Sequence, residues 1–512
     1  MRVGILLLCA LSILGCNKKP NLLETALKDA GKNKIELEKV IDHYKKSGEE
    51  KKLKAAYYLI ENLPDQYHYK GDGVDKCQKV FGKMESIILT KHDIDYITVW
   101  DSLQHELDST SLLKIQKVRD IEVIKGDYLI KNIDEAFVAW NYPWAKDMSF
   151  ADFCQYILPY KMKNEEPCEW RSYFKQKYKW LKDSLNNYDA FDACVWINED
   201  LKKWFYFSKL NVPFDLSCND LLKIRSGKCP QEVQMAAYAM RALGIPVTME
   251  GVPYWANRSS RHDWNALIYK GKTIPFLGSE VNPGVYKVEF AYPGSLYSKR
   301  AKVFRTTYET KTDSPVATES EDIPKTFKNK RYKDVTAQYV PVSNVEIKVD
   351  VNKLTGDIPT LGYLCVFNNK QWKPVDWCRI ENGVMQFQDI GSFNIAYLPI
   401  VYEDGELIPV AEPFILAKDG SVTYVKLDKS KTNTFTIDRK YPSGDDNLIA
   451  PGQRYELMYW DNDWRSLSKV TATEKKLTFE NVPEGALLWL KNLDGGYQER
   501  IFTLDHDKIV WW

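Results

Sequence analysis

The stretch of sequence that decides the fold runs from residue 225 to residue 247 and reads RSGKCPQEVQMAAYAMRALGIPV. Pro230 suits the first turn of a helix, because the N–H that proline lacks has no partner there. Gly244 suits the position just after the last turn. Between them, small and medium apolar residues recur at helical spacing: Val233, Ala236, Ala237, Met240 and Leu243. This pattern predicts a helix over residues 231–243 that packs one apolar face on a sheet.

Cys229 stands immediately before this helix. Its sulfur is expected near unpaired backbone N–H groups and the positive end of the helix dipole, which lowers a thiol pKa and favours the nucleophilic thiolate. Gly227 permits the tight backbone turn that leads from a strand into the helix. A structural alternative is that Cys229 is simply a buried cysteine.

Residues 245–252 and 262–269 predict two strands, and the turn at residues 270–272 leads into a third at 273–276. His262 opens the second of these strands, where its side chain can face a cleft. It is the only histidine between Cys229 and residue 311. An imidazole placed there can take the thiol proton and return it to a leaving group. The alternative is a hydrogen-bonded structural histidine.

The order and spacing of these elements resemble the transglutaminase-like superfamily of papain-related cysteine enzymes. The matching residues are Arg225, Gly227, Cys229, the run 241–247 (RALGIPV), His262, and Trp264 with Asn265. The resemblance covers roughly residues 200–300 and implies an α+β core with Cys229 as nucleophile and His262 as general base and then acid. Segments 153–160 and 499–512 resemble exported proteins of Bacteroidetes type.

One element departs from the family pattern. An Asp usually ends the strand after the histidine and orients the imidazole, but here Pro275 and Phe276 are followed by residues 277–280 (LGSE). We expect Glu280, or else Asn282, to take this role, because both residue types orient histidines in related triads. Asp263 follows His262 on a strand and is expected to point to the opposite face.

Four residues around His262 are candidates for lining a substrate cleft: Trp255, Asn257, Arg258 and Trp264. Each of them fits core packing or loop stabilisation equally well. The sequence therefore leaves both roles open, contact with a substrate and structural packing.

The N-terminus predicts export and lipid anchoring. Arg2 precedes an apolar run over residues 5–14, which is too short to span a bilayer as a helix. The run ends in residues 13–16 (ILGC), which resemble a bacterial lipobox with Cys16 as the acylated residue. The alternative is an ordinary secretory signal with an accidental cysteine. We expect a lipoprotein of the cell envelope, held in the outer membrane by lipid and facing the periplasm or the cell surface.

Periodicity changes along the chain predict an α+β multidomain protein. We expect a lipoprotein signal peptide (1–15), a helical N-terminal region (16–165), a transglutaminase-like α+β core (166–310), a polar linker (311–335), and two β-sandwich modules (336–430 and 431–512). A polar break near residues 428–434 separates the last two. Three to four domains suit the length of 512 residues.

Composition limits the function classes. The chain has 71 Lys and Arg against 70 Asp and Glu and no clustered basic stripe, so nucleic acid is not an expected partner. Eight cysteines remain after Cys9 and Cys16. Local disulfides at 154–168 and 365–378 are plausible in an oxidising compartment. The cysteine spacing fits no zinc site, and we expect no metal and no cofactor.

Two functions remain. The first is a thiol hydrolase (peptidase or amidase) or acyltransferase that acts on amide bonds of a peptide, glycopeptide or cell-wall substrate. The second is a catalytically inactive lipoprotein that binds glycans or proteins through its aromatic-rich β-modules. The 16 Trp, 31 Tyr and 20 Phe residues allow such binding, although β-sandwich packing explains them as well.

Overall fold

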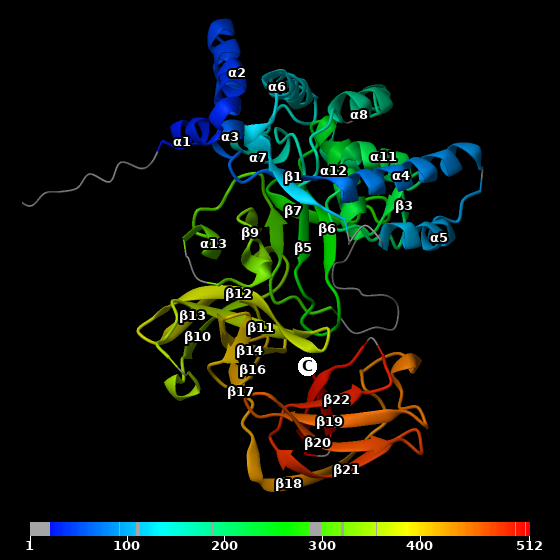
Figure 1. The fold of residues 1–512 in the computed structure, drawn as a ribbon, viewed down its shortest axis with the longest axis vertical. Coiled ribbons are helices and arrows are strands. Elements are labelled where there is room, and N and C mark those ends of the chain that lie inside the picture. The colour runs from blue at the N-terminus through cyan, green and yellow to red at the C-terminus, as the bar shows by residue number, and fades with distance from the viewer. Residues whose placement is uncertain are drawn as a thin grey trace, which may run out of the picture.

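The structure is a computed structural model, and it describes residues 21–91, 93–108, 113–185, 189–285, 298–318, 322–354, 356–496, 498–506 and 508–512. The predicted signal peptide and Cys16 lie outside the described residues. Helices occupy the N-terminal half and antiparallel strands the C-terminal half (Figure 1), which confirms the expected α+β fold class.

The N-terminal half contains eleven described helices before the one that follows Cys229. They are α1 (Leu22–Asp29), α2 (Lys34–Ser47), α3 (Glu50–Glu61), α4 (Asp72–Thr90), α5 (Tyr96–Asp108), α6 (Gly126–Trp140), α7 (Phe150–Tyr156), α8 (Arg171–Lys177), α9 (Leu181–Ser184), α10 (Ala190–Leu201) and α11 (Cys218–Ile224). A hairpin of β1 (Tyr67–Lys70) and β2 (Gln116–Arg119) lies among them. The apolar positions at helical spacing on α2, such as Leu37, Val40 and Ile41, are buried as their periodicity predicts.

Helix α12 (Cys229–Ala242) lies against a five-stranded antiparallel sheet. The strand order is β7 (Lys272–Phe276), β6 (His262–Tyr269), β5 (Val247–Val252), β8 (Phe304–Thr306) and β9 (Tyr332–Asp334). A short parallel pair of β3 (Tyr206–Phe207) and β4 (Ser226–Gly227) leads into the helix. One continuous hydrophobic core runs from Ala26 to Val335, so the helices and this sheet pack as one unit.

The C-terminal half consists of two β-units. The first is an eight-stranded sheet of β10 (Val342–Lys348), β13 (Val384–Gly391), β12 (Gln371–Glu381), β11 (Leu361–Asn368), β14 (Ile395–Glu403), β16 (Phe414–Leu416) and β17 (Val422–Tyr424), with β15 (Glu406–Pro409) paired to β14. The second has a five-stranded sheet of β20 (Trp464–Thr471), β19 (Arg454–Trp460), β22 (Leu488–Asn492), β23 (Ile501–Asp505) and β24 (Lys508–Trp511), and a pair of β18 (Asp428–Ile437) and β21 (Leu477–Glu484).

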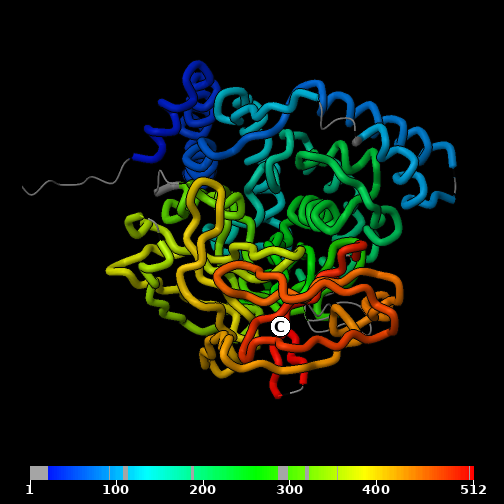
Figure 2. Tube along the Cα trace, turned by 60° about the horizontal axis from the view of Figure 1, so that its bottom comes forward, coloured from blue at the N-terminus to red at the C-terminus, as the bar shows by residue number. Residues whose placement is uncertain are grey.

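A shared aromatic core joins the two β-units. Phe367 and Trp372 of the first unit contact Trp489 and Trp460 of the second, with ring centroids 5.3 Å and 5.6 Å apart. Figure 2 brings the C-terminal unit forward and shows its strands beside those of the eight-stranded sheet. These tryptophans therefore pack between sheets, which is the structural alternative that the sequence left open.

β17 is the last strand of the first β-unit, and the polar residues 428–434, where we expect a break between the two modules, begin the second unit as part of β18, which pairs with β21. Most of its side chains are exposed, and this explains why its composition resembles a turn.

The segment 311–335 is not a free linker. A short helix, α13 (Pro315–Thr318), lies within it, and its last residues form β9, the outer strand of the five-stranded sheet. Ile323 and Phe327 are buried in the core between the two β-units. Because two separate cores include this segment, it fixes the first sheet to the β-rich half.

The expected disulfides are also wrong, because Cys154, Cys168, Cys365 and Cys378 are all free thiols. Cys365 lies opposite Pro374 in the β11–β12 hairpin, whereas Cys378 lies opposite Gly362. Their offset along the hairpin separates the two thiols. Cys168 lies beside Cys218 rather than Cys154, and its thiol raises the pKa of the Cys218 thiol in addition to the larger effect of burial.

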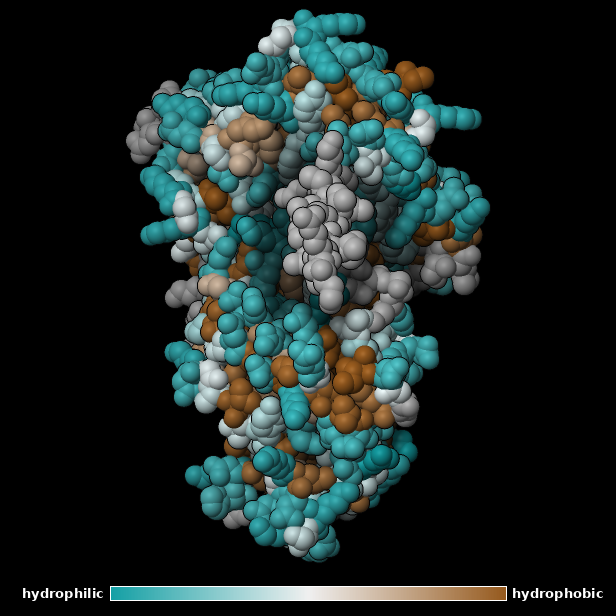
Figure 3. Space-filling model, turned by 90° about the vertical axis from the view of Figure 1, so that its left-hand side faces the viewer, coloured by the Kyte–Doolittle hydropathy of each residue, from teal (hydrophilic) through white to brown (hydrophobic). Residues whose placement is uncertain are grey.

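None of the helices in the described ranges is long and apolar enough to cross a membrane. The surface seen from one side is mostly hydrophilic, with apolar side chains gathered at the level of the β-rich half (Figure 3).

Candidate active site

The backbone before Cys229 is held from several directions. Arg225 ends α11 with a positive φ of 48°, and the chain then turns into β4. The Ser226 hydroxyl accepts a hydrogen bond of 2.6 Å from the indole N–H of Trp100. The Gly227 carbonyl accepts one of 2.8 Å from the backbone N–H of Ser208. A side chain on Gly227 would collide with Gln231, so glycine is required where the strand meets the helix.

Cys229 is the first residue of α12, and its side chain is half-buried. Burial raises the pKa of its thiol to about 12, and the carboxylates of Glu232, Asp263 and Glu280 act in the same direction. A backbone hydrogen bond at Cys229 lowers this pKa but is outweighed. The expected acidic thiol is therefore not present in this structure, because negative charge and burial exceed the effect of the helix N-terminus.

His262 is the first residue of β6 and lies between two indole rings. Its ring stacks on Trp255 with centroids 6.2 Å apart and contacts Trp264 at 6.1 Å. Burial lowers the pKa of the imidazole; Asp263 raises that pKa and Arg258 lowers it. The imidazole is accordingly neutral at neutral pH, which is the form that can accept a proton.

Asp263 connects the two candidate catalytic groups electrostatically, because its carboxylate acts on the pKa of both Cys229 and His262. Side chains alternate along β6, so Asp263 shares a face with Asn265, and the amide of Asn265 donates a hydrogen bond to Val233 of α12. Asp263 thus faces the helix that carries Cys229. By the same alternation, His262 points to the opposite face of β6 from Asp263, as the sequence predicts.

Within the described part of the chain, no hydrogen bond joins the Cys229 thiol to the His262 ring. Contacts of this kind are often long in an enzyme without substrate and shorten when substrate binds. The described residues thus show a neutral thiol and a neutral imidazole without a preformed ion pair between them.

Glu280 lies on a tight turn that packs against α12. Leu277 and Val281 form a two-way backbone bridge with hydrogen bonds of 2.9 Å, and Ser279 between them has a positive φ of 60°. A side chain on Gly278 would collide with Ala236 and with the backbone of the helix. The turn thereby places Glu280 over the first turns of α12.

The Glu280 carboxyl faces the carboxyl of Glu232. Burial raises the pKa of the Glu232 carboxyl, and the charge of Glu280 raises it further. Partial desolvation of its carboxyl also raises the pKa of Glu280, which is the more exposed of the two residues. Glu232 is 1% exposed, and its Oε1 accepts a hydrogen bond of 3.3 Å from the Ser279 hydroxyl, while Oε2 is buried without a partner. In this structure the Glu280 carboxyl therefore interacts with Glu232, and no interaction with the expected partner, His262, is seen among the described residues.

Two residues of this site were missed from the sequence. Glu232 follows Cys229 by one helical turn, and an acidic residue within a helix that is otherwise buried is the signal that could have identified it. Asn198 of α10 accepts a hydrogen bond of 2.9 Å from the Ser279 backbone and donates one of 2.9 Å to Asn282. Asn282 thus supports the turn. No pattern in the sequence links Asn198 to this turn at residues 277–282.

The four candidate cleft residues are mostly held in the interior. Trp264 is fully buried and donates a hydrogen bond of 3.1 Å to the Tyr339 hydroxyl. The Asn257 side chain accepts one of 2.7 Å from the Lys299 backbone. Trp255 is buried beside His262, and Arg258 acts on the imidazole through its charge. Their contact with a substrate stays a prediction.

Across the described ranges, no cluster of three or more His, Cys, Asp or Glu side chains is arranged to hold a metal ion. The site itself contains a thiol, an imidazole and three carboxyl groups.

Comparison with known proteins adds little. No family model matches the chain, and no curated protein is similar to it. A solved structure of a candidate cysteine protease from Cytophaga hutchinsonii matches 22% of the chain at 20% identity with a TM-score of 0.19. The match spans about two fifths of that structure's length, 39%. At that TM-score it carries no argument about activity.

Proposed function

We propose that the protein is a lipid-anchored cysteine hydrolase or acyltransferase of transglutaminase-like type that acts on amide bonds. The observation that carries the proposal is that one carboxylate, Asp263, acts on both the Cys229 thiol and the His262 imidazole. A thiol at the start of a helix and a neutral imidazole on the adjoining strand provide a nucleophile and a base.

In the proposed reaction, the Cys229 sulfur attacks the amide carbonyl carbon while His262 accepts the thiol proton. The C–N bond breaks, the amine leaves with the proton from His262, and a thioester remains on Cys229. Water then hydrolyses the thioester, or a second amine takes the acyl group. Because the resting thiol has a raised pKa, proton transfer has to accompany the attack rather than precede it.

The substrate class that we propose is a peptide, glycopeptide or cell-wall fragment, which an exported protein would meet. The anchor is proposed at Cys16, in the outer membrane. Cys16→Ser is expected to move the protein from the membrane fraction to the soluble fraction, and unchanged fractionation would contradict the anchor.

Formation of the thioester is the direct test. The purified chain is incubated with a p-nitrophenyl ester of a short peptide, and the intact mass is measured. We expect an acyl adduct on Cys229 that is absent in Cys229→Ala and strongly reduced in His262→Asn. Cys168→Ala, which removes another half-buried thiol, is the matched control and is expected to react normally. No adduct in the unmodified chain would overturn the enzyme proposal.

The second candidate is an inactive protein that binds glycans or protein partners. One observation favours it: the raised pKa of Cys229, to about 12, suppresses the thiolate. A failed acylation test together with glycan or protein binding would support this candidate.

A further inference from the structure

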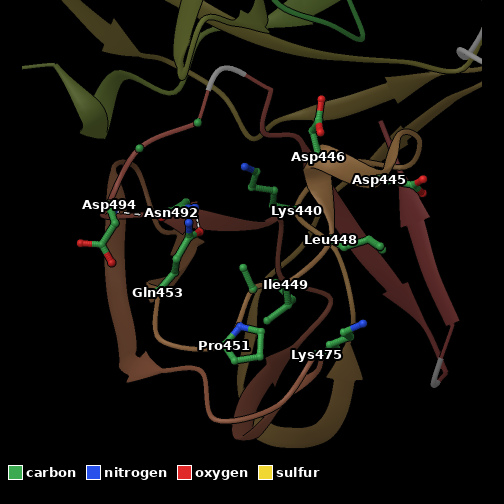
Figure 4. A pocket seen from close by; sticks show the side chains of 13 residues that line it. Lys440, Asp445, Asp446, Leu448, Ile449, Pro451, Gln453, Lys475, Asn492 and Asp494 are labelled. Carbon is green, nitrogen blue, oxygen red and sulfur yellow. Dashed lines mark hydrogen bonds between the residues drawn. The ribbon is translucent and has the colours of Figure 1, made fainter.

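A cavity of about 500 Å³ lies in the C-terminal β-unit, away from Cys229. Its walls come from the loop between β18 and β19 and from the loop that follows β22 (Figure 4). The lining contains no aromatic side chain; Lys, Asp, Asn, Gln and Gly residues share it with four apolar residues, 448–451 (LIAP). Charged and amide groups of this kind bind polar ligands.

Lys440 is the central feature of this cavity. Its side chain is 5% exposed, and its backbone is fixed by hydrogen bonds with Asn447 and Arg500. Among the described residues, none accepts a hydrogen bond from Nζ or forms an ion pair with it. Figure 4 shows the amine in the space between Asn492 and Asp446. A buried ammonium group without a counter-ion is costly, which points to an anionic group that would pair with it.

The nearest buried carboxylate is already neutralised. Glu499 pairs with Lys370 at 2.9 Å and accepts hydrogen bonds from Trp489 and from the Asn492 backbone. Burial lowers the pKa of Lys440; Glu499 and Asp446 raise it and Lys370 lowers it. Glu499 is thus taken up by other partners, and the Lys440 ammonium stands outside the internal ion pairs of the described residues.

Further hydrogen-bond donors lie next to Lys440. Gly495 and Gly496 have φ angles of +120° and +124°, which brings their backbone to the cavity wall. A side chain on Gly496 would come within 2.5 Å of Lys440 Nζ and displace the amine from its present place. Asn492 donates to Gln453 at 2.7 Å and so orients the Gln453 amide at the cavity.

The rim carries both signs of charge, with three aspartates against Lys475. Asp445 and Asp446 are exposed, while Asp494 is paired with Arg454 at 2.8 Å. Carboxylates and amides on a rim accept and donate hydrogen bonds to hydroxyl or amine groups. We propose that this cavity binds a small polar ligand through its carboxylate, which pairs with Lys440 Nζ while the remaining hydroxyl or amine groups contact the acidic rim. A sugar acid and a peptide C-terminus both have this chemistry.

Calorimetric titration of the purified full chain with two probes, glucuronate and alanyl-alanine, tests the proposal. We expect saturable binding of at least one acid and at least about tenfold weaker binding of its neutral counterpart, glucose or the dipeptide amide. Binding of glucuronate alone identifies a sugar acid, and binding of the dipeptide alone identifies a peptide terminus. Absence of saturable binding at millimolar concentration, or equal binding of the neutral counterparts, would overturn the proposal.

Lys440→Met is expected to weaken binding of the acid by about tenfold or more, because the charged partner is lost. Lys508→Met, at an exposed lysine of β24 outside the cavity lining, is the matched control and is expected to bind nearly as the unmodified chain does. Should Lys440→Met fold poorly, amine labelling of the unmodified chain serves instead, with Lys440 expected to be protected by the bound acid. Full binding by Lys440→Met, or labelling unchanged by the acid, would refute the role of this lysine.

Discussion

The Asn265 side chain donates a hydrogen bond of 2.9 Å to the backbone carbonyl of Val233, and this bond joins the strand that carries His262 to the helix that carries Cys229. The same amide donates a second bond of 3.1 Å to the Thr248 carbonyl on the neighbouring strand. Asn265 is fully buried. One side chain therefore fixes the relative position of the two candidate catalytic groups.

Replacement of Asn265 by Ala is expected to lower the free energy of unfolding by about 1–3 kcal/mol, because both of its carbonyl partners lose a donor in the interior. Chemical denaturation measures the change. If the candidate site is catalytic, acylation of Cys229 is expected to fall in parallel. An unchanged denaturation midpoint would show that this bond does not hold the helix on the sheet.

Because the pKa of the Cys229 thiol is raised to about 12, we expect a particular pH dependence of its alkylation rate. The thiolate is the reactive form, so alkylation of Cys229 by iodoacetamide is expected to be slow near neutral pH and to accelerate about tenfold for each unit of pH. Peptide mass spectrometry after timed labelling measures the rate at each cysteine. Faster labelling of Cys229 than of Cys168 at neutral pH would instead support the acidic thiol that the helix N-terminus alone predicts.

Much of this site follows from the sequence because its signals are local. Pro230 and Gly244 bracket the helix correctly to within two residues, and the strand from His262 to Tyr269 has the predicted bounds. Capping residues and alternation depend on near neighbours, so one chain is sufficient to identify them.

The electrostatics of the site could not be predicted, because they depend on residues distant in the chain. Glu280 meets Glu232 only after the turn at Ser279 is fixed by Asn198, 81 positions earlier. The thiol pKa likewise reflects three carboxylates from three elements. For the same reason, β9 resembled a linker, since its three residues are exposed and only pairing with β8 makes them a strand.

The buried carboxyl of Glu232 is expected to make the free energy of unfolding depend on pH. Burial raises its pKa in the folded state above that of the unfolded chain, near 4.3. Its contribution is therefore fully present below about pH 4 and is lost as the pH rises toward the folded pKa. A glutamine at position 232 cannot ionise, so the stability of Glu232→Gln does not fall in this way as the pH rises. We therefore expect the variant to be more stable than the unmodified chain by about 1–3 kcal/mol at neutral pH.

Denaturation at several pH values checks this expectation. The two proteins are expected to converge near pH 4, where Glu232 is protonated in both states. Glu38→Gln on an exposed helix face is the matched control and is expected to change the pH dependence little. A variant that is less stable than the unmodified chain at neutral pH would mean that the Glu232 carboxylate is satisfied in the folded protein.

A buried ion pair between Arg305 and Glu250 supports the residues on which the His262 ring packs. Arg305 donates a hydrogen bond of 2.6 Å from Nε to Glu250, which is 2% exposed, and Glu250 also accepts one from the Tyr339 hydroxyl. Tyr339 in turn holds the indole of Trp264, on which the His262 ring packs. Loss of Arg305 would leave a carboxylate in the interior without a counter-ion.

Arg305→Met is expected to lower the free energy of unfolding by about 3–5 kcal/mol, the cost of removing one partner of a buried pair. Lys39→Met breaks an exposed pair with Asp127 of similar length, 2.7 Å, and is expected to change the stability little, because solvent screens the two charges. The double variant Arg305→Met with Glu250→Gln is expected to recover part of the loss, because no charge then remains buried. If Arg305→Met and Lys39→Met change the free energy of unfolding equally in chemical denaturation, solvent reaches the Glu250 carboxylate, which contradicts a buried ion pair behind His262.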